Sequence, residues 1–175
     1  MHTMILISTL LFALGCSLVP LLRVFILHEA ESHKTISDGL SGPWHWIEDA
    51  GFAAFAAGFA VLGVSLASPV TWLCWLVAAG VLGAMVTDSF RAALKRLTGW
   101  TDARCRKVHL ASAYTAFGGA LALECALARG WLWALVALYP IAVGVFYWLW
   151  PKYTAWQEKA ATAAIVIFLL AWSLT

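Results

Sequence analysis

The chain has 175 residues, of which 63% are hydrophobic and 11% charged, and its formal net charge is +2. Soluble domains average about 45–50% apolar and about 25% charged residues, and a soluble fold of this size could not hide so much apolar surface from water. The composition therefore excludes an ordinary soluble protein. It predicts an all-α integral membrane protein that forms a single transmembrane helical domain over residues 1–175.

Six apolar segments follow one another along the chain. A spanning helix needs about 20 mostly apolar residues, and hydropathy predicts spans at about 4–27, 44–66, 70–88, 109–128, 131–150 and 157–172. The connections between them are short, so successive helices are expected to be antiparallel neighbours in one bundle. Pro140 should kink the fifth span.

The segment 88–97, directly after the third span, is amphipathic. Apolar and basic side chains fall on opposite stripes of a helix, with Phe90, Leu94 and Leu97 on one and Arg91, Lys95 and Arg96 on the other. We expect this segment to lie in the membrane interface as a helical extension of the third span.

The basic residues are distributed very unevenly. If the helices alternate in direction, the loops 28–43, 88–108 and 151–156 share one face of the membrane. Ten of the eleven lysines and arginines then lie on that face: Arg23, Lys34, Arg91, Lys95, Arg96, Arg104, Arg106, Lys107, Lys152 and Lys159. Only Arg129 lies on the other. By the positive-inside rule the first face is cytoplasmic, which predicts an inner-membrane protein with both termini extracytoplasmic.

Small residues recur at a spacing of four in several spans, as in Gly80 with Ala84 and Ala116 with Ala120. Such pairs let two helix backbones approach closely in a membrane. We expect these faces to be helix-packing surfaces.

Polar side chains collect at the predicted cytoplasmic ends of the helices. Carboxylates and imidazoles at the edge of the hydrocarbon are costly to insert, so they usually face the bundle interior and find partners. The candidates for a catalytic role are His45, Asp49, Asp88 and His109. The candidates for ligand binding are Ser37, Asp38, Glu48, Arg91 and Ser112. The simpler alternative is that most of these groups are solvated loop residues or structural ion pairs.

An anion is the ligand that this end of the bundle favours. The cytoplasmic ends of the second and fourth spans are helix N-termini, whose free N–H groups and positive dipole attract a phosphate. The basic segment after the third span reinforces that preference. The sequence thus predicts a pocket for a lipid headgroup or another small anionic ligand.

The histidines allow two cofactors as alternatives, Zn²⁺ and haem b. Histidines and carboxylates in one pocket can bind Zn²⁺, and the candidate ligands are His28, His33, His45 and His109. The i, i+5 spacing of His28 and His33 differs from the i, i+4 spacing of a zinc helix. Haem b usually needs histidines that face each other within the bundle, whereas every histidine here except His2 lies at one rim.

Two features lie toward the opposite end of the bundle. Glu124 is a carboxylate within an apolar helix, which makes it a functional candidate. The alternative is that it pairs with Arg129 or reaches the outer interface. Cys74 and Cys125 both fall near extracytoplasmic helix ends, where a disulfide between them could form.

Several short motifs resemble a known family. They are Thr-Ile-Ser-Asp at 35–38, Gly-Pro at 42–43, Thr-Asp at 87–88 and His-Leu-Ala-Ser-Ala-Tyr-Thr-Ala-Phe at 109–117. The chain resembles the domain-of-unknown-function 998 family of six-pass bacterial and archaeal membrane proteins over nearly its whole length. The resemblance implies a six-pass architecture and marks Ser37, Asp38, Asp88 and His109, but it implies no settled activity. The runs 28–33 and 46–49 depart from that family.

Three classes of function are compatible with these observations. The first is a lipid-handling or accessory protein whose partners are membrane lipids. The second is a metal-dependent membrane hydrolase in which the four catalytic candidates act on a lipid ester. The third is a structural subunit of a larger membrane complex or a homo-oligomer. No motif for nucleic-acid binding is present.

Overall fold

In the computed structural model, the described residues are 2–21, 45–149 and 154–175, and they form α-helices joined by turns, with no β-strand among them. The helices are α1 (His2–Leu21), α2 (His45–Ser65), α3 (Val70–Ser89), α4 (Arg91–Thr98), α5 (Asp102–Leu127), α6 (Leu132–Leu149) and α7 (Thr154–Ser173). The predicted all-α class is confirmed for these residues.

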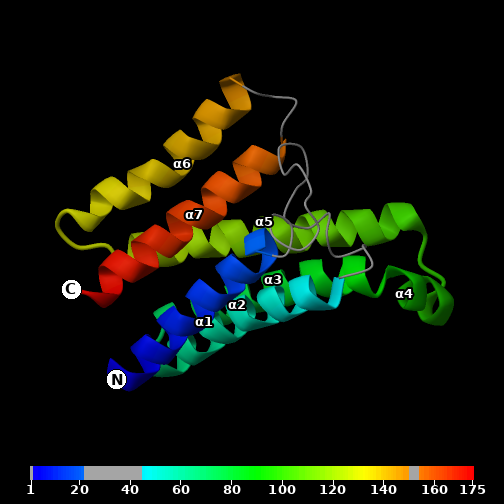
Figure 1. Ribbon diagram of the computed structural model, residues 1–175, viewed down its shortest axis with the longest axis horizontal. Coiled ribbons are helices and arrows are strands. Elements are labelled where there is room, and N and C mark those ends of the chain that lie inside the picture. Colours follow the sequence, from blue (N-terminus) through cyan, green and yellow to red (C-terminus); the bar gives the residue numbers. More distant parts are fainter. Residues whose placement is uncertain (1, 22–44, 150–153) are drawn as a thin grey trace.

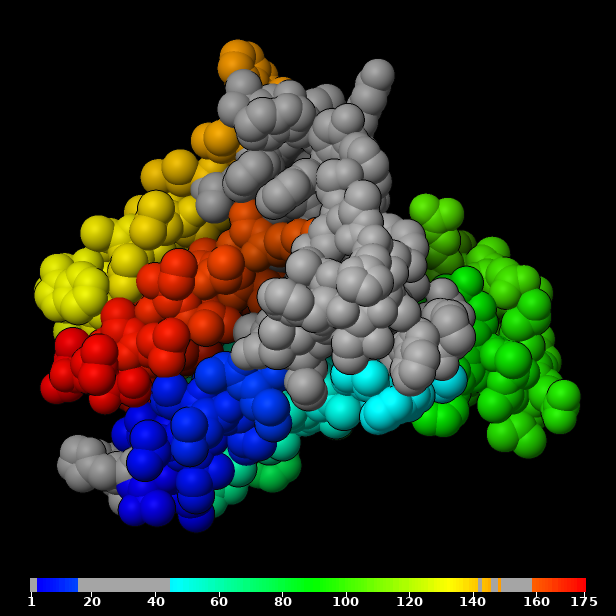
Figure 2. Space-filling view, in the orientation of Figure 1, coloured from blue at the N-terminus to red at the C-terminus, as the bar shows by residue number. Residues whose placement is uncertain are grey.

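The helices pack as a central group and a hairpin (Figure 1). The most extensive packing joins α3 to α5, α1 to α2, and α2 to α3, while α6 and α7 pack on each other and touch α1 and α5 less extensively. The two chain termini lie at the same end of the bundle, and α4 lies at the other end. Figure 2 shows the green atoms of α4 and the start of α5 projecting at the right edge of the molecule.

Three helices, α2, α3 and α5, are long and apolar enough to span a membrane. The segments 3–15, 132–145 and 159–173 form shorter apolar helices within the described residues. Large apolar side chains are exposed along the bundle, among them Leu10, Val64, Leu138 and Ile141. An exterior of this kind is stable in lipid and not in water, so the chain is a membrane protein.

Two boundaries differ from the sequence prediction. α5 begins at Asp102, well before the predicted start at 109, because Thr101 caps it by accepting a hydrogen bond from the Arg104 backbone N–H at 3.2 Å. Hydropathy locates the apolar part of a helix and misses polar turns that extend it. The amphipathic segment is also a separate helix, since a turn at Phe90 divides α4 from α3 and Gly99 ends α4 with a φ of 69°.

Close backbone contact holds α3 against α5. A Cβ atom added at Gly80 would lie 2.7 Å from the backbone nitrogen of Ala116 and 2.8 Å from the carbonyl oxygen of Ser112. Real Cβ atoms do not approach backbone atoms this closely. The prediction that small residues form this packing surface is confirmed.

The disulfide that could join Cys74 and Cys125 is not formed. Cys74 is buried and Cys125 is exposed, and both thiols are free. Cys74 packs toward α2, with its Cβ close to the position that a Cβ on Gly63 would take. Cys125 lies on the exposed side of α5, so the two thiols point in different directions.

Candidate functional site

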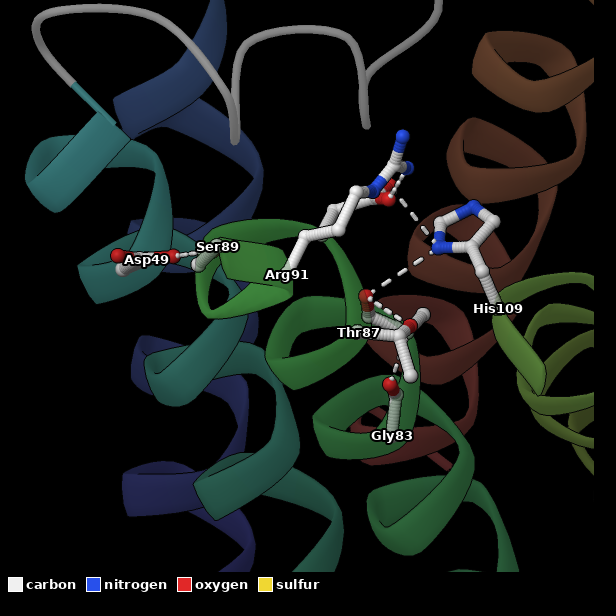
Figure 3. Close-up of polar contacts among 8 residues, drawn as sticks. Asp49, Gly83, Thr87, Ser89, Arg91 and His109 are labelled. Carbon is white, nitrogen blue, oxygen red and sulfur yellow. Dashed lines mark hydrogen bonds and ion pairs between the residues drawn. The ribbon is translucent and has the colours of Figure 1, made fainter. Parts of the chain in front are cut away.

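Asp88, in the last turn of α3, is the centre of a polar cluster. Its Oδ1 accepts a hydrogen bond from Nη2 of Arg91, at the start of α4. Its Oδ2 lies 3.0 Å from Nδ1 of His109, in α5. The Asp88 side chain is 10% exposed, that of His109 15% and that of Arg91 43%. One mostly buried carboxylate therefore holds two nitrogen donors from two neighbouring helices, Arg91 and His109, which are labelled in Figure 3.

The contacts of His109 define its tautomer. Nδ1 lies 3.0 Å from a carboxylate oxygen of Asp88 and 3.2 Å from the carbonyl oxygen of Ala84, and both of these atoms only accept hydrogen bonds. We therefore assign the proton to Nδ1. In the neutral ring Nε2 then carries a lone pair, which can accept a proton or a hydrogen bond from a ligand.

A second contact links α3 to α2. The hydroxyl of Ser89 donates a hydrogen bond to Oδ1 of Asp49, and the two side chains face each other in Figure 3. Each residue turns a helix by about 100°. The adjacent residues Asp88 and Ser89 of α3 therefore point toward different helices, Asp88 toward α5 and Ser89 toward α2. The last turn of α3 thus joins α2, α4 and α5.

The structure brings together part of the predicted site. Asp49, Asp88, Arg91 and His109 lie in or beside the cluster, as the convergence of helix ends predicted. Ser112 lies one turn along α5 and packs against α3, where its Oγ is 2.6 Å from the position that a Cβ on Gly83 would take. His45 is exposed at the start of α2, and Glu48 is buried in the same turn.

Four predicted residues, Ser37, Asp38, His28 and His33, lie outside the described residues. Within 2–21, 45–149 and 154–175, no three His, Cys, Asp or Glu side chains are grouped closely enough to hold a metal ion. His45 and His109 therefore do not share a three-ligand metal site with other described residues. The geometry of the cluster is that of a hydrogen-bonded acid, base and guanidinium.

Two participants were missed by sequence reasoning. They are Ser89 and the backbone carbonyl of Ala84, which accepts hydrogen bonds from both His109 and Thr87. Ser89 could have been found, because a serine next to an aspartate at the end of an apolar run is a polar group at the same depth. A backbone carbonyl carries no signal in the sequence.

The surface beside the cluster is basic. Lys95 of α4 forms an exposed ion pair with Asp102 at 2.7 Å, and the Arg104 guanidinium lies 4.9 Å from the centre of the Trp100 ring. The exposed side chains of Lys95, Arg96 and Leu97 give α4 both charge and apolar surface. This combination is typical of helices that lie in the headgroup layer.

Ser89→Ala should lower the free energy of unfolding by about 1.5 kcal/mol, because a hydrogen bond to a charged carboxylate is lost from a partly buried place. Ser65→Ala is the matched control, since among the described residues the Ser65 hydroxyl donates only to the Val61 carbonyl of its own helix. Thermal unfolding in detergent measures both. Equal stability of the two variants would show that the hydrogen bond between Ser89 and Asp49 contributes nothing to the free energy of unfolding.

No family model matches the chain, and no match was found among curated proteins or solved structures. The resemblance to the domain-of-unknown-function 998 family therefore stays a prediction.

Proposed function

We propose that the chain is a six-span inner-membrane protein that binds the phosphate headgroup of a membrane lipid in the cluster around Asp88. Both termini are extracytoplasmic in this proposal, and the cluster is cytoplasmic. The observation that carries it is the single carboxylate of Asp88 holding both Arg91 and His109. A fixed pair of nitrogen donors suits a phosphate, which offers several acceptor oxygens.

The depth of the cluster supports a headgroup as the ligand. Eighteen helical steps separate His109 from Leu127 in α5 and Val70 from Asp88 in α3, about 27 Å in each case. The hydrocarbon core of a bilayer is about 30 Å thick. With the turns 66–69 and 128–131 at one surface, Asp88 and His109 come to the level of the headgroups at the other.

The charges of the cluster define how a phosphate would be held. Arg91 is nearly half exposed and has guanidinium N–H groups beyond the one given to Asp88. With a second proton on Nε2, His109 donates to a phosphate oxygen while Asp88 holds Nδ1. The basic side chains of α4 attract the anionic lipid surface around them.

Mass spectrometry of the gently purified protein tests the proposal. We expect a phospholipid to copurify and to be displaced by vesicles that contain a different anionic phospholipid, but not by vesicles of a neutral glycolipid. Recovery of lipid-free, folded protein that does not take up phospholipid from vesicles would refute it.

The tautomer of His109 favours a second candidate, a hydrolase that acts on a lipid ester. In a general-base histidine, a carboxylate holds Nδ1 and the lone pair of Nε2 accepts the proton. Asp88 and His109 have this arrangement. Release of fatty acid or headgroup from phospholipid vesicles by the purified protein, lost in His109→Ala, would establish this activity. Binding without product would leave headgroup binding as the function.

The proposed topology predicts which residues are reachable from outside the cell. In a variant without the native cysteines, Arg104→Cys should react with a membrane-impermeant maleimide only after the inner membrane is permeabilised. Thr175→Cys, at the other end of the bundle, should react while the inner membrane is intact, provided that the maleimide can cross the cell envelope outside that membrane. Both side chains are exposed, so access depends on sidedness alone. Labelling of residue 104 in intact cells would invert the topology.

A further inference from the structure

Glu124 is buried at the end of the bundle opposite the cluster around Asp88. Its side chain is 1% exposed, and neither carboxyl oxygen has a hydrogen-bond partner among the described residues. It lies fifteen helical steps from His109, about 22 Å along α5. The two groups therefore belong to different sites.

The predicted pair between Glu124 and Arg129 is wrong. Nη1 of Arg129 donates instead to the Ala128 carbonyl at 3.0 Å, and both carboxyl oxygens of Glu124 are without a partner among the described residues. The Glu124 side chain is buried within the bundle. The basic side chain closest in sequence thus leaves the carboxyl without a counter-charge.

The helices around Glu124 are apolar. Leu123 and Leu127 of α5 belong to the same buried core as Leu132 and Val136 of α6. A further core group is supplied by α7, namely Ala161, Ile165, Phe168 and Leu169. An ionised carboxylate in such a place would lose its hydration without gaining a partner. The neutral, protonated carboxyl is the form that fits.

Among the described residues, few titratable groups lie toward this end of the helices that pack on α5. Tyr139 of α6 is buried in the same core as Leu123 and Leu127, the neighbours of Glu124 in α5. In α3 the buried thiol of Cys74 lies toward the same end of the bundle. Lys159 of α7 lies in the first two turns of that helix, at the end opposite its C-terminus. None of these groups is a fixed cation beside the carboxyl.

We propose that Glu124 is a proton-binding site of the membrane domain, reached from the extracytoplasmic side. The carboxyl holds its proton while α6 and α7 cover it. The carboxyl releases the proton to water when α6 and α7 move away from α5 and expose it. The hairpin of α6 and α7 packs on α5 less extensively than its two helices pack on each other, so it is the part of the bundle that can move as a unit.

Carbodiimide labelling of the full chain in lipid vesicles tests this proposal. N,N′-dicyclohexylcarbodiimide enters the bilayer and reacts with protonated carboxyl groups. The carboxyl proton moves to one nitrogen as the carboxyl oxygen bonds to the central carbon, and the adduct rearranges to a stable N-acylurea. We expect the adduct on the peptide that contains Glu124 at mildly acidic pH, with a yield that falls severalfold as the pH is raised to mildly alkaline values.

The controls separate proton binding from simple burial. Glu124→Gln should abolish the adduct on that peptide, while Asp102→Asn, which removes an exposed carboxylate of the same helix, should leave it unchanged. Circular dichroism verifies that each variant is helical. Absence of the adduct from folded wild-type protein at every pH would overturn the proposal, and so would a yield that does not change with pH.

Discussion

Asp88→Ala is expected to reduce the phospholipid retained by the purified protein by roughly tenfold or more. The substitution removes the carboxylate that holds both Arg91 and His109, so both donors lose their fixed positions. The contact between Asp88 and His109 is the mostly buried one, and a hydrogen bond to a charged group contributes about 1.5–3 kcal/mol, while about 1.4 kcal/mol is a factor of ten in affinity. His109→Ala should weaken retention as well, because it removes one of the two donors.

Asp102→Ala is the matched control for Asp88→Ala. It removes a carboxylate at the same end of the bundle, but one that is exposed and paired only with Lys95. Exposed pairs of this kind contribute about 0–1 kcal/mol. Lipid mass spectrometry, normalised to folded protein by circular dichroism, compares the three variants. Retention at the wild-type level in both Asp88→Ala and His109→Ala would end the headgroup proposal.

The second large effect concerns the seam between α3 and α5. Gly80→Ala should destabilise the fold by about 1–3 kcal/mol, because the new methyl group meets two backbone atoms that cannot move without separating the helices. For a domain of this size that corresponds to a fall in Tm of several degrees. Thermal unfolding in detergent, followed by circular dichroism, gives the shift.

Gly118→Ala provides the comparison for Gly80→Ala. Gly118 lies in α5 and a Cβ added there would meet no atom within 4 Å. Alanine is also the better helix former, by about 1 kcal/mol in an exposed helix, so this variant should keep or raise the Tm. Equal falls in Tm for the two variants would show that the close approach of α3 and α5 is not the reason why Gly80→Ala is destabilising.

The helical class and the seam between α3 and α5 could be predicted because they depend on composition and local spacing. Apolar length predicts a membrane helix regardless of its neighbours, and small residues four apart predict a face that packs closely. The start of α5 could not be predicted in this way. It depends on Thr101 as a capping residue and on polar turns that hydropathy ignores.

The candidate site was predictable in its location but not in its connections. A shared position at the helix ends indicated that Asp49, Asp88, Arg91 and His109 would gather. The i, i+3 spacing of Asp88 and Arg91 is a local signal for their ion pair. Nothing local indicated that Asp88 would also hold His109, or that Asp49 would take Ser89 as its partner. The last two pairs join residues on helices distant in sequence, so they depend on how each helix is rotated about its axis.

The amino-acid sequence by itself determined that this chain is a helical membrane protein with its polar groups concentrated at one end. That follows because transfer of apolar side chains from water to lipid depends on how much surface they have and hardly on their neighbours. Tertiary packing alone decided that Glu124 turns into the bundle and away from Arg129, and that His109 carries its proton on Nδ1. A rotation of about 100° separates one helical residue from the next, so small differences in packing choose the partner of every polar side chain.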